Sequence, residues 1–363
     1  MIRSFLQAIQ KGDLYEIRSR VLANSELLYC TNRHGDTPLL VAARHGHVTI
    51  LKLLADECEV SLSQSNVDGK TALHEAACSE QMKAVEFLCR RNVKVDCLKR
   101  ADWTPLMMAC TKSRQDVVAA LVAAGASTSL QNKDGWNSFH IACREGHADI
   151  LNYLLDIEPS CWKTVSHNGR TPLHTVALLG RLIAAKILHL RCGYKGDECD
   201  SCGATPFMDA CRANAVEMAE FLSMTYKCDV SASDCLGRMP VHHAAQAGSK
   251  EALDMLIRHR VDINCQAQSN GMTSLHYAAK EGHCKIIHQL LNGGAEVNTK
   301  DKKGRTALHM ASGGGYTDCV QALLYDYNAI DSKDDSGQTA LDLARNEAIA
   351  ELIRTCTNNS RHD

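Results

Sequence analysis

Polar and apolar positions follow one another along this chain in a pattern that returns every 33 or 34 residues. Each unit has a polar residue followed by Gly, a motif like T-P-L-H, a pair of small residues and a second apolar segment that often ends in paired leucines. The motif begins at positions 37, 71, 104, 137, 171, 205, 239, 273, 306 and 339. Thr before Pro is typical of a helix start, because Thr caps the helix and Pro needs no hydrogen-bonded N–H at the first helical position. The pattern predicts two helices in every unit.

This motif and its spacing resemble the ankyrin repeat, whose T-P-L-H-x-A signature and period of about 33 residues are specific. The resemblance implies an all-α fold, an ankyrin-repeat solenoid of paired antiparallel helices joined by β-hairpin turns. Since one unit cannot bury its apolar face alone, we expect one continuous stack. Residues 1–32 are expected to form N-terminal capping helices, around Phe5–Lys11 and Leu14–Leu22. Residues 33–356 then form ten repeats, the last one a cap, and residues 357–363 a polar tail.

Composition narrows the class of protein. Lys and Arg number 40 against 42 Asp and Glu, and the net charge of −2 argues against a surface that grips nucleic acid or an anionic membrane as a whole. No apolar run approaches the roughly 20 residues of a spanning helix. The N-terminus lacks the features of a signal peptide, so we expect a cytoplasmic protein, with the nucleus as a second location. In that setting the 18 cysteines are expected to be reduced thiols.

Histidine and cysteine raise the question of metal binding. Six histidines occupy the fourth motif position, where the family resemblance implies hydrogen bonds to the backbone of a neighbouring turn: His74, His140, His174, His242, His276 and His309. A zinc site could be built from His189, Cys192, Cys199 and Cys202. Against zinc, Cys202 falls at the Asp position of a turn, and an ankyrin stack needs no metal to fold. Cys110, Cys143 and Cys211 share one small-residue position and are interpreted as core. We expect neither a metal nor another cofactor.

All three tryptophans lie between residues 103 and 162. Trp103 and Trp136 share the position just before the helix cap, which the resemblance places on the concave binding surface. They are predicted, with Trp162 and Arg170, to contact a partner. The alternative is that the rings only shield neighbouring turns. Basic residues surround the same turns, and Lys99, Lys133 and Lys163 are separated by 34 and 30 residues, so neighbouring turns would stack them. The alternative for these lysines is an ordinary solvated surface.

The strings RHGDTPLLVAARHGH (33–47), ADWTPLMMAC (101–110) and NKDGWNSFHIACREGH (132–147) resemble, within the family, a member that binds alanyl-tRNA synthetase. That resemblance implies a non-enzymatic cofactor protein that binds the catalytic domain of the synthetase and limits serine misincorporation. It also implies that its own lysines accept misactivated serine. The acceptors are expected to be Lys133 and Lys163, with Lys99 as the third.

Arg100, adjacent to Lys99, is the alternative third position; it would be unable to act, because a guanidinium stays protonated. The competing hypothesis is a generic ankyrin scaffold that holds an unrelated protein through Trp103 and Trp136. Under either hypothesis, the protein is expected to be a monomer when no partner is present. It is expected to bind neither a membrane nor, directly, nucleic acid. An enzyme is disfavoured, because no nucleophile–base pair or cofactor loop emerges from the motifs.

Overall fold

The computed structural model describes residues 2–359 of the chain, and these residues contain helices and turns but no β-strand. Two isolated antiparallel bridges, Ser65 with Thr71 and Lys99 with Trp103, mark two of the turns. The all-helical prediction is therefore confirmed, whereas the β-hairpin form of the turns stays a prediction. The chain folds into two compact units. Among the described residues, unit 1 comprises residues 2–172 and 186–192, and unit 2 comprises residues 173–185 and 193–359.

Unit 1 begins with α1 (Ile2–Lys11), α2 (Leu14–Ala23) and the short η1 (Ser25–Tyr29), which occupy the segment assigned to the N-terminal cap. Pairs of helices follow: α3 (Pro38–Arg44) with α4 (Val48–Lys52) and its continuation η2 (Leu53–Glu57), α5 (Ala72–Cys78) with α6 (Met82–Arg90), α7 (Pro105–Cys110) with α8 (Gln115–Ala123), and α9 (Ser138–Glu145) with α10 (Ala148–Ile157). Two short turns, η3 (Arg100–Asp102) and η4 (Cys161–Lys163), lie in the connections.

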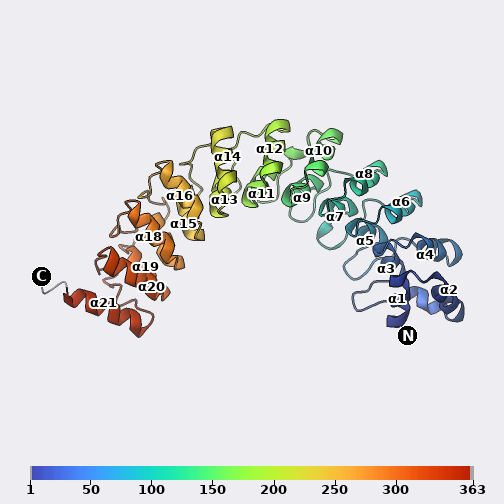
Figure 1. Ribbon diagram of the computed structural model, residues 1–363, viewed down its shortest axis with the longest axis horizontal. Coiled ribbons are helices and arrows are strands. Elements are labelled where there is room, and N and C mark those ends of the chain that lie inside the picture. The colour runs from blue at the N-terminus through green and yellow to red at the C-terminus, as the bar shows by residue number, and fades with distance from the viewer. Residues whose placement is uncertain (1, 360–363) are drawn as a thin grey trace. The chain divides into compact units, whose positions relative to one another are not determined.

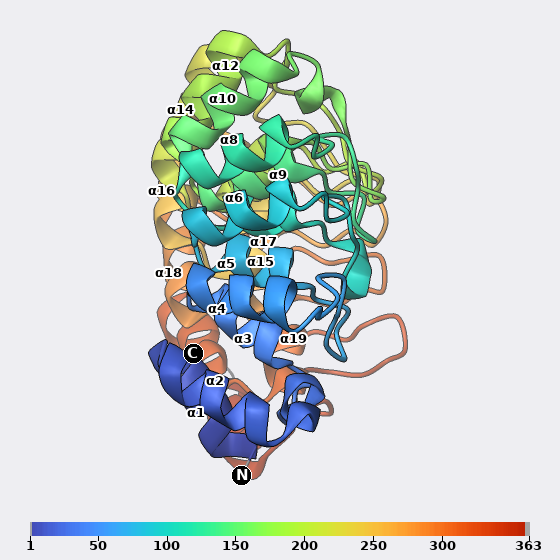
Figure 2. The ribbon, with the colours of Figure 1, turned by 90° about the vertical axis from the view of Figure 1, so that its right-hand side faces the viewer.

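The helix pairs of unit 1 stack in two rows (Figure 1). The first helices α3, α5, α7 and α9 each contact the next in their row, and the second helices α4, α6, α8 and α10 do the same. Figure 2 shows the second row on one side of the first and the long turns on the other side. This arrangement places the turn residues of successive repeats next to one another.

The boundary between the units passes through α11 (Pro172–Leu178) and α12 (Leu182–Arg191). Unit 2 continues with the pairs α13 (Pro206–Arg212) and α14 (Val216–Tyr226), α15 (Pro240–Ala247) and α16 (Lys250–Arg258), α17 (Ser274–Glu281) and α18 (Cys284–Asn292), and α19 (Ala307–Gly314) with α20 (Thr317–Gln321) and η5 (Ala322–Asp326). The last helix, α21 (Glu347–Asn359), extends three residues into the segment assigned to the polar tail. The rest of that segment lies outside the described residues.

Small residues at fixed positions let the first helices pack closely. Ala42, Ala76, Ala142 and the predicted core thiols Cys110, Cys143 and Cys211 are 0% exposed. Burial raises the pKa of the Cys143 thiol well above its usual range, so this sulfur stays protonated in the core. The interpretation of these three cysteines as core residues is confirmed.

Five of the six motif histidines tie their own repeat to a later turn. His74 Nδ1 accepts the N–H of Thr71 (3.2 Å), and its Nε2 donates to the carbonyl of Trp103 in the following turn (3.0 Å). His174, His242, His276 and His309 make the same kind of bond to carbonyl oxygens of later turns, at 3.0, 3.0, 2.9 and 3.3 Å. His140 differs, because its Nδ1 donates to the amide oxygen of Asn137 (2.8 Å) and its Nε2 makes no hydrogen bond within the described residues. The predicted bond to the backbone of a neighbouring turn is therefore confirmed for five of the six histidines and not for His140.

Within the described residues, no group of three or more His, Cys, Asp or Glu side chains is arranged to hold a metal ion. That includes the cysteines of the zinc hypothesis. The same part of the chain contains no helix with both the length and the apolarity to cross a bilayer.

Candidate functional site

Backbone hydrogen bonds set a common register for the turns of unit 1. The N–H of Lys99 donates to the carbonyl of Trp103 (3.0 Å), and the N–H of Asn132 donates to the carbonyl of Trp136 (2.9 Å). The N–H of Ser166 donates in the same way to Arg170 (2.9 Å). Trp103, Trp136 and Arg170 therefore stand at one equivalent position in three consecutive turns, directly before the helix cap.

Both tryptophan rings are half-buried and in contact with cations. The Lys99 Nζ lies 5.2 Å from the centre of the Trp103 ring. The Arg144 Cζ lies 5.7 Å from the Trp103 ring and 5.8 Å from the Trp136 ring. Trp136 also stacks on His140, with 6.1 Å between ring centroids and 22° between planes. We call these five residues the turn stack.

Arg144 is the member of the turn stack that the sequence analysis missed. It lies in the last turn of α9 and also pairs with Glu145, with 2.6 Å between Nη2 and Oε1. The same helix position carries Arg44 and Arg212 in other repeats, so a basic residue there could have been noticed. That its guanidinium reaches two tryptophan rings from successive turns depends on the stacking of the repeats. The rings therefore have intramolecular partners, and their half-buried state leaves area for a further contact.

Lys99 occupies an unusual environment for a lysine. Burial, followed by the nearby Lys70 ammonium, lowers the pKa of the Lys99 amine from its usual value. A larger share of this amine is thus unprotonated at neutral pH than in a fully solvated lysine. Arg100 is exposed, and its Nη1 lies 3.4 Å from a carboxylate oxygen of Asp68. Of the two neighbours, Lys99 is the one beside an aromatic ring.

Lys133 and Lys163 are both exposed. Lys163 ends η4, and its Nζ lies 5.8 Å from the centre of the half-buried Trp162 ring. The N–H of Lys133 donates to the carbonyl of Ala101 in the previous turn (3.1 Å). Lys99 and Lys163 thus each lie over a tryptophan ring, Trp103 and Trp162 respectively, whereas Lys133 is tied to the previous turn through its backbone.

The three lysines do not occupy equivalent positions, and this corrects the expected stacking by spacing. Lys99 precedes Trp103 by four residues, Lys133 precedes Trp136 by three, and Lys163 precedes Arg170 by seven. By turn register, the counterpart of Lys133 in the preceding repeat is Arg100, whose N–H likewise donates to the previous turn, at Asp68 (2.7 Å). Two lysines separated by about one repeat need not occupy equivalent positions, because the connections between helices differ in length. One of these connections also contains the short helix η4.

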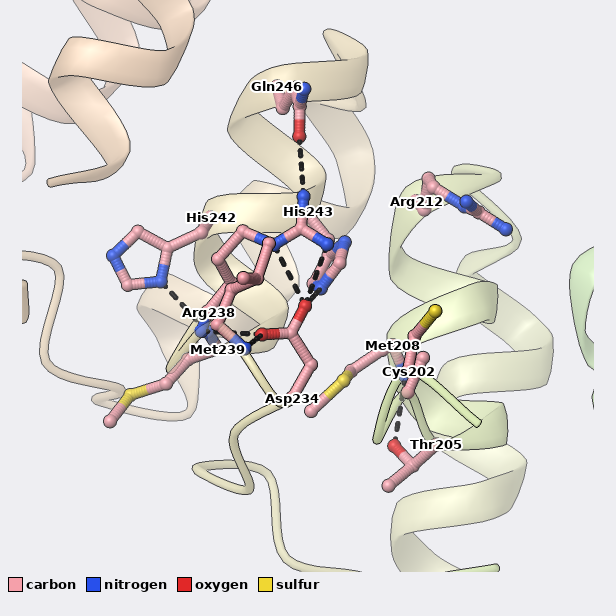
Figure 3. Close-up of polar contacts among 12 residues, drawn as sticks. Cys202, Thr205, Met208, Arg212, Asp234, Arg238, Met239, His242, His243 and Gln246 are labelled. Carbon is pink, nitrogen blue, oxygen red and sulfur yellow. Dashed lines mark hydrogen bonds and ion pairs between the residues drawn. The ribbon is translucent and has the colours of Figure 1, made fainter. Parts of the chain in front are cut away.

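In unit 2 the position directly before the helix cap carries arginine in two of the turns, Arg238 and Arg305. Arg238 stands where unit 1 has tryptophan, and its Nε donates to the buried carboxylate of Asp234 (2.8 Å) (Figure 3). Although burial raises it, hydrogen bonds from Arg238 bring the pKa of Asp234 below its usual value. Arg305 and Asp301 repeat the pair. These arginines are neutralised within their own turns, so the aromatic and cationic site is a feature of unit 1.

The fold defines a class of helical repeat protein in which stacked helix pairs present a series of turns. A family model described as ankyrin repeats (3 copies) matches residues 5–99, 91–164, 224–301 and 275–361. These matches cover well over half of the chain, which therefore belongs to the ankyrin repeat family. Ankyrin repeats are protein-interaction scaffolds and are generally non-enzymatic.

Curated relatives share the repeats at low identity. The ankyrin repeat and KH domain-containing protein mask-1 of Caenorhabditis elegans is 28% identical over 281 residues, 74% of this chain and 10% of that protein. The B-cell lymphoma 3 protein homolog of Mus musculus is 25% identical over 242 residues, 64% of this chain and 46% of that protein. The glycerophosphocholine phosphodiesterase GDE1 of Candida albicans is 28% identical over 153 residues, 41% of this chain and 13% of that protein. The chain thus spans less than half the length of each relative.

Proposed function

We propose that this ankyrin repeat protein binds the catalytic domain of alanyl-tRNA synthetase and limits serine mischarging by accepting misactivated serine on its own lysines. The motif strings of unit 1 resemble ankyrin repeat domain-containing protein 16, which implies this role. The observation that carries the proposal is the turn stack. It combines a half-buried lysine amine of lowered pKa with tryptophan rings that retain exposed area.

The acceptor step is aminolysis of a mixed anhydride. The unprotonated ε-amine attacks the carbonyl carbon of seryl-adenylate, an amide bond forms, and the bond from that carbon to the phosphate oxygen breaks. AMP leaves with the bonding electrons, and the proton of the attacking amine passes to solvent. Because the anhydride is already activated, the step needs no further nucleophile or base. Each lysine is consumed, so the protein acts as a sink for serine and not as a turnover catalyst.

The environment of Lys99 supports it over Arg100 as the third acceptor. Its amine can lose the proton, and its pKa is lowered, whereas a guanidinium stays charged throughout the physiological range. Lys163, like Lys99, lies over a tryptophan ring, in its case Trp162. Lys133 belongs to the proposal through the family resemblance and its exposure. Among the three, we expect Lys99 to be modified fastest at neutral pH.

Mass spectrometry tests the proposal directly. The full chain is incubated with alanyl-tRNA synthetase, ATP and serine, with alanine in a parallel tube, and modified lysines are mapped. Lys99→Arg, Lys133→Arg and Lys163→Arg are compared with Lys94→Arg, an exposed lysine outside the turn stack. A seryl addition on Lys99, Lys133 or Lys163 that the matching variant removes supports the proposal. Co-purification without modification would refute acceptance and leave a binding regulator.

A generic scaffold for an unrelated partner is the second candidate, favoured by one observation. The Trp103 and Trp136 rings are already held by Lys99 and Arg144, so these cations can serve to orient an aromatic surface and have no acceptor role. Absence of any association between this protein and the synthetase in a pull-down with purified components would favour this candidate.

A further inference from the structure

A groove lies at the N-terminal end of unit 1, between α1, the segment of residues 31–34 and α3. Its volume is about 830 Å³. Its apolar lining consists of Ile2, Leu6 and Val41, and its basic lining consists of Arg3, Arg33, His34 and Arg44. We call this site the cap groove. Sites of roughly 300–1,000 Å³ hold drug-sized ligands, so the cap groove has room for a short peptide segment.

The charges that line the cap groove are all of one sign. Neither Asp nor Glu is among its lining residues. The Arg44 guanidinium is already balanced, since it lies 2.8 Å from carboxylate oxygens of both Asp36 and Glu75. Arg3 and Arg33 are exposed, and within the described residues neither makes an ion pair with a carboxylate. The chain as a whole carries a net charge of −2, so the positive charge of the cap groove is a local feature of this surface.

The apolar lining of the cap groove sets a second condition that a ligand has to meet. Leu6 and Val41 are 8% and 4% exposed, while Ile2 keeps 46% of its surface accessible. The accessible apolar surface of the groove therefore belongs mainly to Ile2, and an aliphatic side chain would cover it, whereas a purely ionic ligand would leave it in water. Gln7 and Gln10 also line the groove and offer amide groups that can bond to an extended peptide backbone.

We propose that the cap groove binds an acidic peptide segment of a protein partner that carries an aliphatic side chain between its carboxylates. The aliphatic group packs against Ile2, Leu6 and Val41, and the carboxylates pair with the guanidiniums of Arg3 and Arg33. A guanidinium binds a carboxylate with two parallel hydrogen bonds, and the apolar lining beside the arginines favours a peptide over a small inorganic anion. This inference is independent of the synthetase proposal, because it uses none of the residues of the turn stack.

Fluorescence anisotropy with short labelled peptides tests the proposal on the full chain. The probe is the pentapeptide Glu-Leu-Glu-Leu-Glu, and the matched probes replace either both leucines by Ser or all three glutamates by Lys. The site variant is Arg3→Glu combined with Arg33→Glu. Its fold should be preserved, since both residues are exposed and an acidic residue in the first turn of α1 suits the helix dipole. The matched control is Arg90→Glu, whose side chain is 80% exposed on α6.

We expect the Glu-Leu probe to bind the wild-type chain, and the site variant to weaken its affinity about tenfold because two attractions become repulsions. Arg90→Glu should change the affinity less than twofold, and Ile2→Ser should weaken it without changing its salt dependence. Equal binding of the Lys probe or the Ser probe would overturn the proposal, as would an unchanged affinity in the site variant.

Two other occupants are outcomes of the same experiment. A concentration-dependent dimer in sedimentation velocity that the site variant abolishes would assign the cap groove to a second copy of this chain and overturn the proposal. Displacement of the probe by a uridine oligonucleotide at lower concentration than by unlabelled peptide would assign the groove to nucleic acid, with the same consequence.

Discussion

The side chain of Arg144 contacts two neighbouring turns and so links them. Its guanidinium lies near the rings of both Trp103 and Trp136, at 5.7 and 5.8 Å. A partly exposed cation–π contact contributes about 0.5–1 kcal/mol, so this residue stabilises the alignment of two neighbouring turns as well as its own helix. It thereby decides how the two rings are presented to a partner.

We predict that Arg144→Ala lowers the free energy of unfolding by about 1–2 kcal/mol and makes the tryptophans more accessible to acrylamide quenching. Arg144→Lys should recover part of both effects. Urea unfolding and steady-state fluorescence measure them, with Arg90→Ala on the exposed surface of α6 as the control. Unchanged quenching in Arg144→Ala would show that the rings are held by the turn backbone alone.

Buried histidines make this protein sensitive to acid. Burial lowers the pKa of His74, His140 and His243 to about 4, from an ordinary value of 6.5. Below pH 6.5 these histidines become protonated in the unfolded chain, whereas in the folded chain they stay neutral until the pH is near 4. Stability is therefore present at neutral pH and is lost as the pH falls through that window.

We predict that the wild-type chain loses about 2 kcal/mol of unfolding free energy per such histidine between pH 7 and pH 5. His74→Gln should be less stable at pH 7 but should lose about 2 kcal/mol less than the wild type over the same interval. Urea unfolding at the two pH values gives the double difference. Identical losses in the two proteins would contradict a depressed pKa for His74.

At the scale of the element, the residues that cap α7 and α9 occupy the same position but make different sets of hydrogen bonds. The Thr104 hydroxyl accepts the N–H of Met107 (3.2 Å). The Asn137 amide oxygen accepts the N–H of His140 (3.0 Å), and its Nδ2 also donates to the carbonyl of Cys161 (3.2 Å) and to the Thr164 hydroxyl (3.1 Å). Asn137 therefore caps a helix and also holds the next connection.

We predict that Asn137→Ala is the more destabilising change. Loss of a cap alone costs about 1 kcal/mol, which is our expectation for Thr104→Ala. Asn137→Ala also leaves the carbonyl of Cys161 without this donor, which adds about 1–3 kcal/mol. Urea unfolding of the two variants side by side gives the comparison, and equal losses would mean that the bonds to residues 161 and 164 contribute nothing.

At the scale of the molecule, the proposed partner contact rests on tryptophan. If the turn stack is the centre of an interface, Trp103→Ala and Trp136→Ala should each weaken binding of alanyl-tRNA synthetase by about 2 kcal/mol. Titration calorimetry measures this, with Tyr15→Ala as a control, since Tyr15 on α2 is 88% exposed and lies outside the turn stack. Full affinity in both tryptophan variants would remove the aromatic anchor from the proposal.

Much of the architecture follows from local pattern. The Thr caps, the prolines at the first helical position and the paired small residues predict where α7 and α13 begin and what they bury, because these preferences act within one turn of helix. The contacts of five motif histidines were predictable for a similar reason, since one residue type at one motif position repeats one contact. His140 departs from the rule because its cap residue is Asn137, whose amide oxygen takes the Nδ1 proton. The alignment of Lys99, Lys133 and Lys163 was not predictable, because it depends on the length and conformation of each connection.

The repeat, the helical class and the shared position of Trp103 and Trp136 can all be read from the order of the amino acids, since each is a matter of spacing and local preference. Three other features emerge only from the folded chain: Arg144 contacts both rings, Lys99 and not Arg100 lies beside Trp103, and Arg3, Arg33 and Val41 line one groove. These contacts join residues of different helices and turns. They depend on the packing of one element against the next, which no periodicity within a single element specifies.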